Sequence, residues 1–229
     1  WLEFRANIDY RQAKRNKQGP YFGQALLNNP TRSPYDETSR SGYNVWIGEE
    51  YDYNFIADAA LYDSNSLDKW FKPEIMAKLN ILPVEGLSYQ QSVGYSTFQY
   101  EDHGYTSMYH SACVADNVNG SASLAFSKNE RLNTEGYFSY DRSFKGGHKV
   151  NAVLGYSYNR YDGEGFSMSN SNFSVDGIKY WDIGKGSYLN AGKASMSSKK
   201  NITEKLLAYF VRANYSYNNR YMVSATYRR

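Results

Sequence analysis

The sequence predicts an all-β fold, namely about seven strands of a larger antiparallel transmembrane β-barrel with long extracellular loops and short periplasmic turns. Three observations predict it. The chain combines 17% aromatic residues with a mean hydropathy of −0.72. Apolar and polar residues alternate along several segments, and the connections between those segments alternate between long and short. Each strand of a barrel wall has one apolar and one polar face, which keeps average hydropathy low.

The composition excludes several classes of protein. No apolar run approaches the ~18 residues that a membrane helix needs. The 26 basic and 23 acidic residues nearly balance, which gives no case for nucleic-acid binding. Cys113 is the single cysteine, so the chain cannot form an internal disulfide. The chain begins at Trp1 without a signal peptide and reaches Arg229 inside an apparent strand, so we expect both ends to be internal to a longer protein.

Period-two alternation is the main signal of secondary structure. It is clearest at Val150, Ala152 and Leu154, which alternate with polar or small neighbours. The pattern predicts antiparallel strands at 4–10, 74–82, 87–96, 133–142, 148–160, 206–217 and 220–228. Each strand is expected to pair with its neighbour in sequence. A short helix is expected at about 21–27, outside the barrel wall.

The connections between these strands distinguish a barrel from a soluble sandwich. Long polar stretches cover about 12–69, 100–131 and 162–203, and short turns lie at 83–86, 143–147 and 218–219. Strict alternation of long and short connections is typical of bacterial outer-membrane barrels, whereas a sandwich has no reason to follow it. Residues 121–126 also alternate, and we assign them to the extracellular loop, where one possibility is that they extend strand 133–142. Counting them as a separate crossing would put 162–203 on the periplasmic side.

The alternation also predicts which side chains face lipid. Arginine on the lipid face near the membrane midplane costs ~2–4 kcal/mol, so Arg212 and Asn214 are expected to face the lumen. The outward set is then Val150, Ala152, Leu154, Tyr156, Tyr158, Val211, Ala213 and Tyr215. Tyrosines at strand ends are expected to form the interfacial girdles: Tyr89, Tyr95, Tyr140, Tyr156, Tyr158, Tyr215, Tyr217 and Tyr221.

Three stretches resemble the SusC/RagA family of TonB-dependent outer-membrane transporters. Residues 21–36 resemble that family's short helix followed by an Asn-Pro-Thr…Pro-Tyr-Asp segment. Residues 143–156 resemble its Phe-Gly-x-His turn leading into an Ala-x-x-Gly-Tyr strand. Residues 207–221 are similar to its Tyr-Phe-x-Arg-x-Asn-Tyr hairpin, and this is the strongest of the three matches. Residues 42–70 depart from the pattern, and no TonB box is present.

The resemblance implies a fold, a function and partners. Residues 1–229 would be part of one TonB-dependent receptor-type β-barrel domain, with the plug domain and the remaining strands outside the sequence. The protein would sit in the outer membrane of a Gram-negative cell and contact its lipid. It would import oligomeric nutrients, glycans or peptides, with a SusD-like surface lipoprotein and the TonB complex, and would need no cofactor. The alternatives are a passive outer-membrane porin and a secreted all-β carbohydrate-binding module.

No residue pattern indicates catalysis or a resident metal, so we expect no enzyme. His103 and His110 are too weak a pair for a metal site, and no base is identifiable beside Cys113. The acidic loop around Glu49 lacks EF-hand spacing. An outer-membrane phospholipase would need a nucleophile with a base and an orienting group, which the sequence does not show. Substrate contacts are instead expected from lumen-facing Arg212 and Asn214 and from the loop aromatics Trp46, Tyr105, Tyr109 and Trp181.

Overall fold

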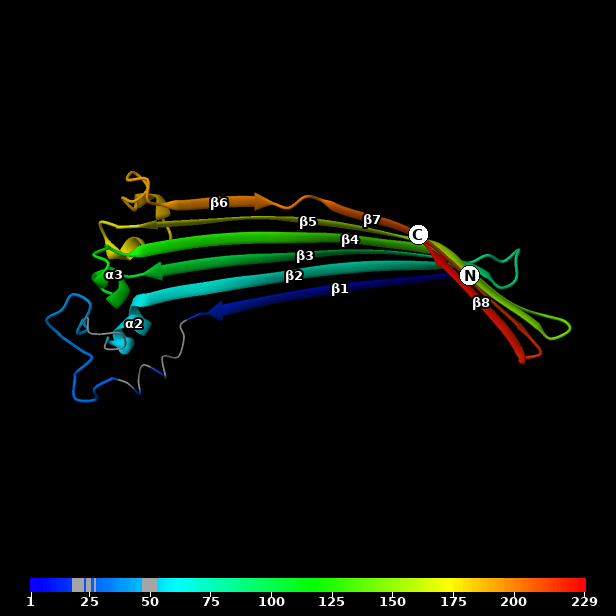
Figure 1. Ribbon diagram of the computed structural model, residues 1–229, viewed down its shortest axis with the longest axis horizontal. Helices are drawn as coiled ribbons and strands as arrows, with labels where there is room; N and C mark the ends of the chain where they lie inside the picture. Colours follow the sequence, from blue (N-terminus) through cyan, green and yellow to red (C-terminus); the bar gives the residue numbers. More distant parts are fainter. Residues whose placement is uncertain (18–22, 24–25, 27, 47–52) are drawn as a thin grey trace.

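The computed structural model describes residues 1–17, 23, 26, 28–46 and 53–229. They form one antiparallel sheet in the order β1-β2-β3-β4-β5-β7-β8, with β6 paired to β5 (Figure 1). The strands are β1 (Leu2–Asn16), β2 (Tyr62–Asn80), β3 (Leu87–Thr106), β4 (Ser121–Phe144), β5 (His148–Ser171), β6 (Ser195–Lys200), β7 (Glu204–Tyr217) and β8 (Tyr221–Arg228). The helices are α2 (Phe55–Leu61), α3 (Ser111–Ala115) and the 3₁₀ turns η1 (Asp176–Ile178) and η2 (Ile183–Lys185). This confirms the predicted all-β, antiparallel fold.

The pairing register continues along each pair of long strands without a bulge. Because side chains alternate across a strand, an uninterrupted register keeps each set of side chains on one face of the whole sheet. One face, called here the apolar face, carries Phe4, Ile8, Ile75, Leu79, Val93, Phe138, Leu154, Val211 and Val223, all of which are exposed. The opposite face, called here the polar face, carries mostly Arg, Lys, Asn, Ser, Asp and Glu.

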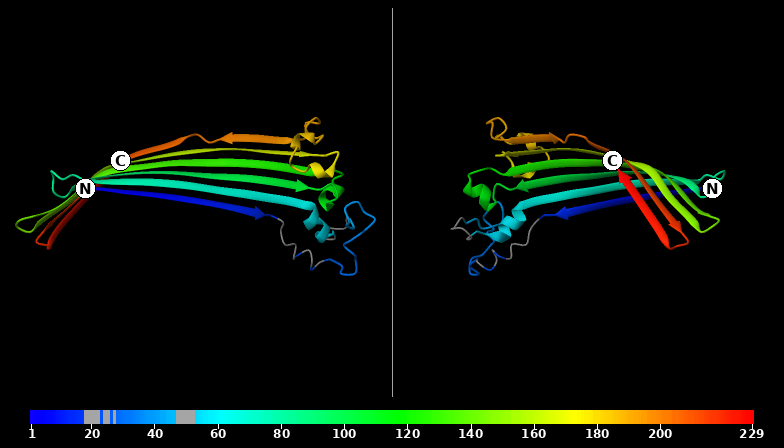
Figure 2. Two further views of the ribbon diagram at one scale, coloured as in Figure 1. Left: turned by 180° about the vertical axis from the view of Figure 1, so that it is seen from behind. Right: turned by 45° about the vertical axis from the view of Figure 1, so that its right-hand side comes forward.

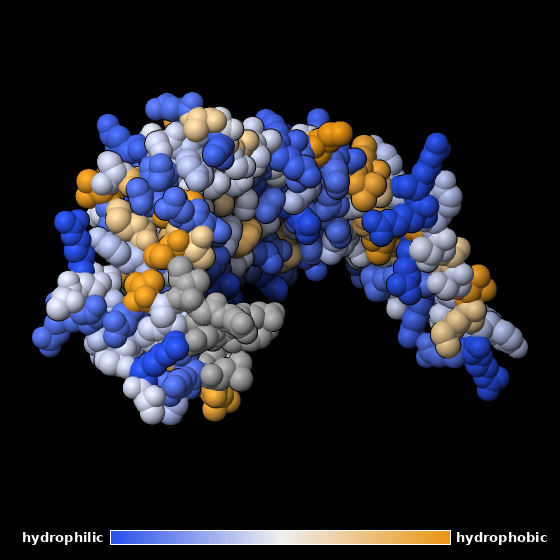
Figure 3. Space-filling model, turned by 60° about the vertical axis from the view of Figure 1, so that its left-hand side comes forward, coloured by the Kyte–Doolittle hydropathy of each residue, from blue (hydrophilic) through white to orange (hydrophobic). Residues whose placement is uncertain are grey.

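The sheet is long and curved. The helices and long connections gather at one end, and the short turns and both termini lie toward the other (Figures 1 and 2). A space-filling view shows an arch hollowed on one side (Figure 3). All strand neighbours except β6 are also neighbours in sequence, as expected for an up-and-down barrel wall. In the described part of the chain, no helix is both long and apolar enough to cross a membrane.

All seven predicted strands are present. The end of the sheet that carries the helices is called here the upper end, and there the predicted strands were too short. Strands β2, β3, β4 and β5 continue far into the stretches that the sequence assigned to loops at 12–69, 100–131 and 162–203. The extensions alternate poorly in hydropathy because neither face there is predominantly apolar, yet the backbone still pairs with its neighbours. Residues 121–126, which the sequence assigned to the extracellular loop, belong to β4 and extend it toward the helices. The helix predicted at about 21–27 falls mostly outside the described residues.

Strand β6 is an addition that the sequence did not predict. It lies within the predicted 162–203 loop and pairs with the upper half of β5, from Glu164↔Lys200 to Ser169↔Ser195. The lower half of β5 pairs with β7 instead. Its sequence, Ser-Met-Ser-Ser-Lys-Lys, has no apolar periodicity, and all six residues are exposed. Its position continues the sheet edge above β7.

The long connections pack together at the helical end of the sheet. Tyr105, Ala122 and Phe173 form a buried core there, covered by Ile178, Tyr180 and Ile183. Two carboxylates connect separate loops. Asp58 in α2 accepts hydrogen bonds from the backbone N–H (2.9 Å) and the hydroxyl of Ser111. Asp176 accepts from the Tyr105 hydroxyl at 2.7 Å and from the Ser107 hydroxyl at 2.9 Å.

Candidate functional site

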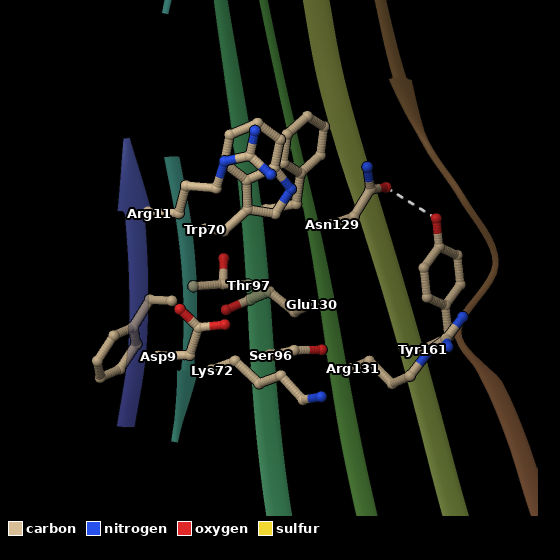
Figure 4. A pocket seen from close by; sticks show the side chains of 12 residues that line it. Asp9, Arg11, Trp70, Lys72, Ser96, Thr97, Asn129, Glu130, Arg131 and Tyr161 are labelled. Carbon is tan, nitrogen blue, oxygen red and sulfur yellow. Dashed lines mark hydrogen bonds between the residues drawn. The ribbon is translucent and has the colours of Figure 1, made fainter. Parts of the chain in front are cut away.

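A band of large polar and aromatic side chains crosses the polar face where the strands approach their upper halves (Figure 4). Its five principal members, called here the cationic band, are Arg11, Trp70, Lys72, Phe98 and Arg131. They come from β1, β2, β3 and β4, and they line a cavity of about 330 Å³ together with Asp9, Ser96, Asn129 and Tyr161. The pairing register explains how they meet, since Arg11 lies opposite Trp70 and Trp70 lies opposite Phe98.

Ring stacking orders the upper row of this band. The Arg11 guanidinium carbon lies 5.1 Å from the Trp70 ring centre, and the Trp70 and Phe98 ring centres are 5.0 Å apart. Trp70 is thus held between a cation from β1 and an aromatic ring from β3. In the row below, the Arg131 guanidinium carbon lies 5.7 Å from the centre of the Tyr161 ring. Such contacts stabilise by ~0.5–1 kcal/mol at exposed sites and restrict where the cation points.

In the described part of the chain, no ion pair neutralises the three cations of the band. Among the described residues, no carboxylate lies within ion-pair distance of Arg11, Lys72 or Arg131. Higher on the sheet the opposite holds, because Arg15 pairs with Asp68 and Lys17 pairs with Asp102, each at 2.8 Å. The band therefore carries exposed positive charge, and two acidic residues also line its cavity. Asp9 lies opposite Lys72 in the pairing register, and Glu130 pairs with Lys128 at 2.9 Å.

Arg212 and Asn214 lie elsewhere on the polar face, near the short turns. Arg212 is exposed and sits opposite Val153 and Thr226. Asn214 donates from Nδ2 to Asn151 Oδ1 at 3.2 Å and accepts from the Ser224 hydroxyl at 2.7 Å. Both occupy the face opposite Val211, but their predicted contact with substrate stays a prediction.

The four loop aromatics do not converge on one site. Tyr105 is only 2% exposed, packs against Phe173 and donates its hydroxyl proton to Asp176, so its prediction as a substrate-stacking residue was wrong. Trp181 is 78% exposed, and its ring packs at a tilt of 44° against Tyr180. Trp46 is half-buried beneath the Arg32 guanidinium, whose carbon lies 5.5 Å from the ring centre, and Tyr109 is half-buried in its loop.

The two loop histidines and the cysteine pack against or hydrogen-bond to neighbouring loop residues. His103 stacks on Tyr180, while His110 accepts a hydrogen bond at Nδ1 from the backbone N–H of Ala112 at the start of α3. Burial raises the pKa of the Cys113 thiol, which disfavours the reactive thiolate. The described residues contain no group of three or more His, Cys, Asp and Glu side chains that could hold a metal ion.

Sequence reasoning did not identify the cationic band, because its members lie on four strands. The short turns could have predicted part of the band. The short connection at 83–86 sets the β2–β3 register, and counting outward from the Leu79↔Tyr89 pair brings Trp70 opposite Phe98. The connection between β1 and β2 is long, so no local feature of the sequence placed Arg11 beside Trp70.

Comparisons with known proteins agree with this fold. No protein-family model matches the chain. The chain is 27% identical, over 64% of its length, to "TonB-dependent receptor P3" of Formosa agariphila, and the match covers 14% of that protein. Its whole length superimposes on "Structure of the RagAB peptide transporter" with a TM-score of 0.74 at 18% identity. The "open-open" state of the RagAB peptide importer gives a TM-score of 0.68 at 16% identity.

These matches confirm the predicted resemblance to a SusC/RagA-type barrel at the level of a barrel segment. The chain spans about a quarter of the matched transporter chains, 26% and 25%, and a smaller share of the curated relative. The matched proteins are a receptor and transporters rather than enzymes, which fits the expectation that this chain is not an enzyme.

Proposed function

We propose that this chain forms part of the barrel wall of a TonB-dependent outer-membrane importer of oligomeric nutrients. The observation that carries the proposal is the two-faced sheet, whose uninterrupted register exposes one continuous apolar face. A soluble protein rarely exposes so large an apolar surface, whereas lipid covers it in a membrane barrel. The similarity to a TonB-dependent receptor and to a peptide transporter supports the same function.

In this proposal the apolar face contacts lipid and the polar face lines the lumen. The wall performs no covalent chemistry. Its polar side chains contact the cargo, which is a glycan or a peptide. Transport is driven by TonB acting on a plug domain that lies outside residues 1–229. The packed connections at the helical end of the sheet are the extracellular side, where a SusD-like lipoprotein would deliver the cargo.

Uptake with and without TonB energisation in the native host tests the proposal. The full-length protein should import a fluorescent oligomer only when the inner-membrane energy supply and TonB are intact. A passive porin would continue to admit the oligomer after TonB is deleted, so TonB-independent uptake would favour the porin alternative. A secreted carbohydrate-binding module would appear in the medium or the soluble fraction without detergent.

Purification tests the proposed partner. The full-length protein, solubilised in mild detergent from its native host, should co-purify with a surface lipoprotein in a fixed ratio. Surface proteolysis of intact cells should release that lipoprotein but leave the strand segments protected. Absence of any lipoprotein from the purified material under several detergents would contradict this part of the proposal, while leaving TonB-dependent import testable by uptake.

A further inference from the structure

We propose that the cationic band binds the carboxylate side chains of an acidic oligopeptide as it passes along the wall. This inference deepens the proposed function and rests on it. Three exposed cations, Arg11, Lys72 and Arg131, share one face of the sheet and lack a carboxylate partner among the described residues. Exposed cations that no protein carboxylate neutralises can attract a ligand of opposite charge, because complementary charges steer and orient binding partners.

Pairing elsewhere on the same face shows that the unpaired cations are a local feature. Arg15 and Lys17, directly above the band, are engaged by Asp68 and Asp102 at 2.8 Å. Below the band, carboxylates appear on the polar face, because Glu74 and Glu135 line the next cavity together with Lys72. The positive zone is therefore bounded along the strands. An acidic cargo would be attracted most strongly at the band, where three cations lie close together.

The aromatic rings orient the guanidinium groups for carboxylate binding. Arg11 lies over Trp70 and Arg131 lies over Tyr161. With its carbon 5.1 Å or 5.7 Å from a ring centre, each guanidinium has no carboxylate from the described residues on its N–H groups, which can donate to the two oxygens of a ligand carboxylate. Tyr161 is itself fixed, since its hydroxyl donates to Asn129 Oδ1 at 2.8 Å. Less side-chain freedom is then lost when the ligand binds.

The geometry favours a peptide over a sugar chain. A pyranose ring binds by stacking on an open aromatic face, but Trp70 lies between Arg11 and Phe98. Arg11 and Arg131 are separated by three strand spacings, about 14 Å at ~4.8 Å per spacing. Acidic residues four positions apart in an extended peptide span about 13 Å. One peptide lying across the strands could therefore reach the cations at both ends of the band.

Binding of matched peptides to the purified full-length protein, with its lipoprotein, tests this inference. The probes are octapeptides of one backbone sequence carrying Glu, Gln or Lys at two positions four residues apart. The combined variant Arg11→Gln, Lys72→Gln, Arg131→Gln should weaken binding of the Glu peptide about tenfold, because each accessible charge pair contributes modestly. Binding of the Gln peptide should stay within about twofold, and the Glu-peptide preference should shrink at high salt.

The control variant is Lys78→Gln, which removes a cation from the same strand and the same face near the short turn. It should leave all three peptides unaffected. Equal weakening of Glu and Gln peptides in the band variant would indicate damage to the wall or to its contact with the plug, and would overturn the inference. A response limited to anionic oligosaccharides would also overturn it. If the unmodified protein imports neither peptides nor glycans, that result contradicts the proposed function itself, independently of the peptide-binding measurements.

Discussion

At the scale of single residues, Gly155 shows how tightly the polar face is packed. A Cβ added there would lie 2.6 Å from the Phe210 ring, 2.6 Å from Tyr137 Cβ and 2.7 Å from the Gly136 carbonyl oxygen. Two of these atoms belong to backbone or to a Cβ and cannot rotate away. Glycine is therefore required by a close approach between strands rather than by a turn.

Gly155→Ala should destabilise the full-length protein by about 1–3 kcal/mol, the usual cost of overpacking a well-packed site. The measurement is the urea concentration at which half of the protein in detergent is unfolded, followed by the change in its electrophoretic mobility. Gly177→Ala is the matched control, because no atom lies within 4 Å of the Cβ it would add. Unchanged stability of the Gly155 variant would mean that the Phe210 ring and Tyr137 do not approach Gly155 as closely as the structure has them.

His110 gives a pH-dependent prediction in the loops. Burial lowers the pKa of its imidazole, and the Asp58 carboxylate, 3.6 Å from Nδ1, opposes that shift. The folded state therefore keeps His110 neutral, with Nδ1 accepting from Ala112. An unfolded loop takes up a proton near pH ~6.5, so the local stability of α3 falls as pH drops below that value.

Hydrogen-exchange protection of residues 111–115, corrected for intrinsic rates, should decrease between about pH 7 and pH 5. His110→Asn should remove most of this pH dependence, because Asn caps a helix without titrating. The same pH response in both proteins would show that a group other than His110 controls the opening of α3.

At the scale of the elements, β7 separates its side chains most clearly. Val211 lies on the apolar face with Leu154, and Arg212 lies on the polar face with Val153. We expect Arg212→Cys to react faster than Val211→Cys with a membrane-impermeant thiol reagent in the full-length protein. Lipid covers position 211 in the proposed barrel, while water reaches position 212. A Cys113→Ser background removes the native thiol, and faster labelling at 211 would reverse the assignment of the two faces.

The strands also show which elements a sequence can predict. The lower strand segments, such as 148–160, alternate because one face is apolar, and they were correctly identified. The upper half of β5 contains Gly163, Glu164, Gly165 and Ser167, which carry no such pattern. Those residues are extended because β4 and β6 offer backbone partners on either side. Backbone pairing does not depend on side-chain hydropathy, so hydropathy could not locate the strand ends.

At the scale of the whole molecule, the sheet is open. Strands β1 and β8 lie at its two ends, each with one long edge unpaired within the described residues. Unpaired edges and an exposed apolar face together favour association with other chains. In a closed barrel, further strands pair with both edges and lipid covers the apolar face.

Residues 1–229 produced alone should therefore not form a cooperatively folded monomer in water. Size-exclusion chromatography should show aggregates, and near-UV circular dichroism should lack a sharp thermal transition. Addition of detergent should reduce aggregation by covering the apolar face. A monodisperse monomer with a cooperative transition in plain buffer would refute the membrane assignment and favour a soluble β module.

The sequence by itself determined the all-β class, the lower strands, the short turns and the two faces of the sheet. These features are local, since alternation and turn residues act over a few positions. Tertiary structure alone decided the strand lengths, β6, the packing of the loops and the cationic band. Arg11 and Trp70, or Tyr105 and Asp176, are far apart in the chain and meet only through pairing and loop closure. No local pattern encodes such contacts, because their geometry depends on every strand between them.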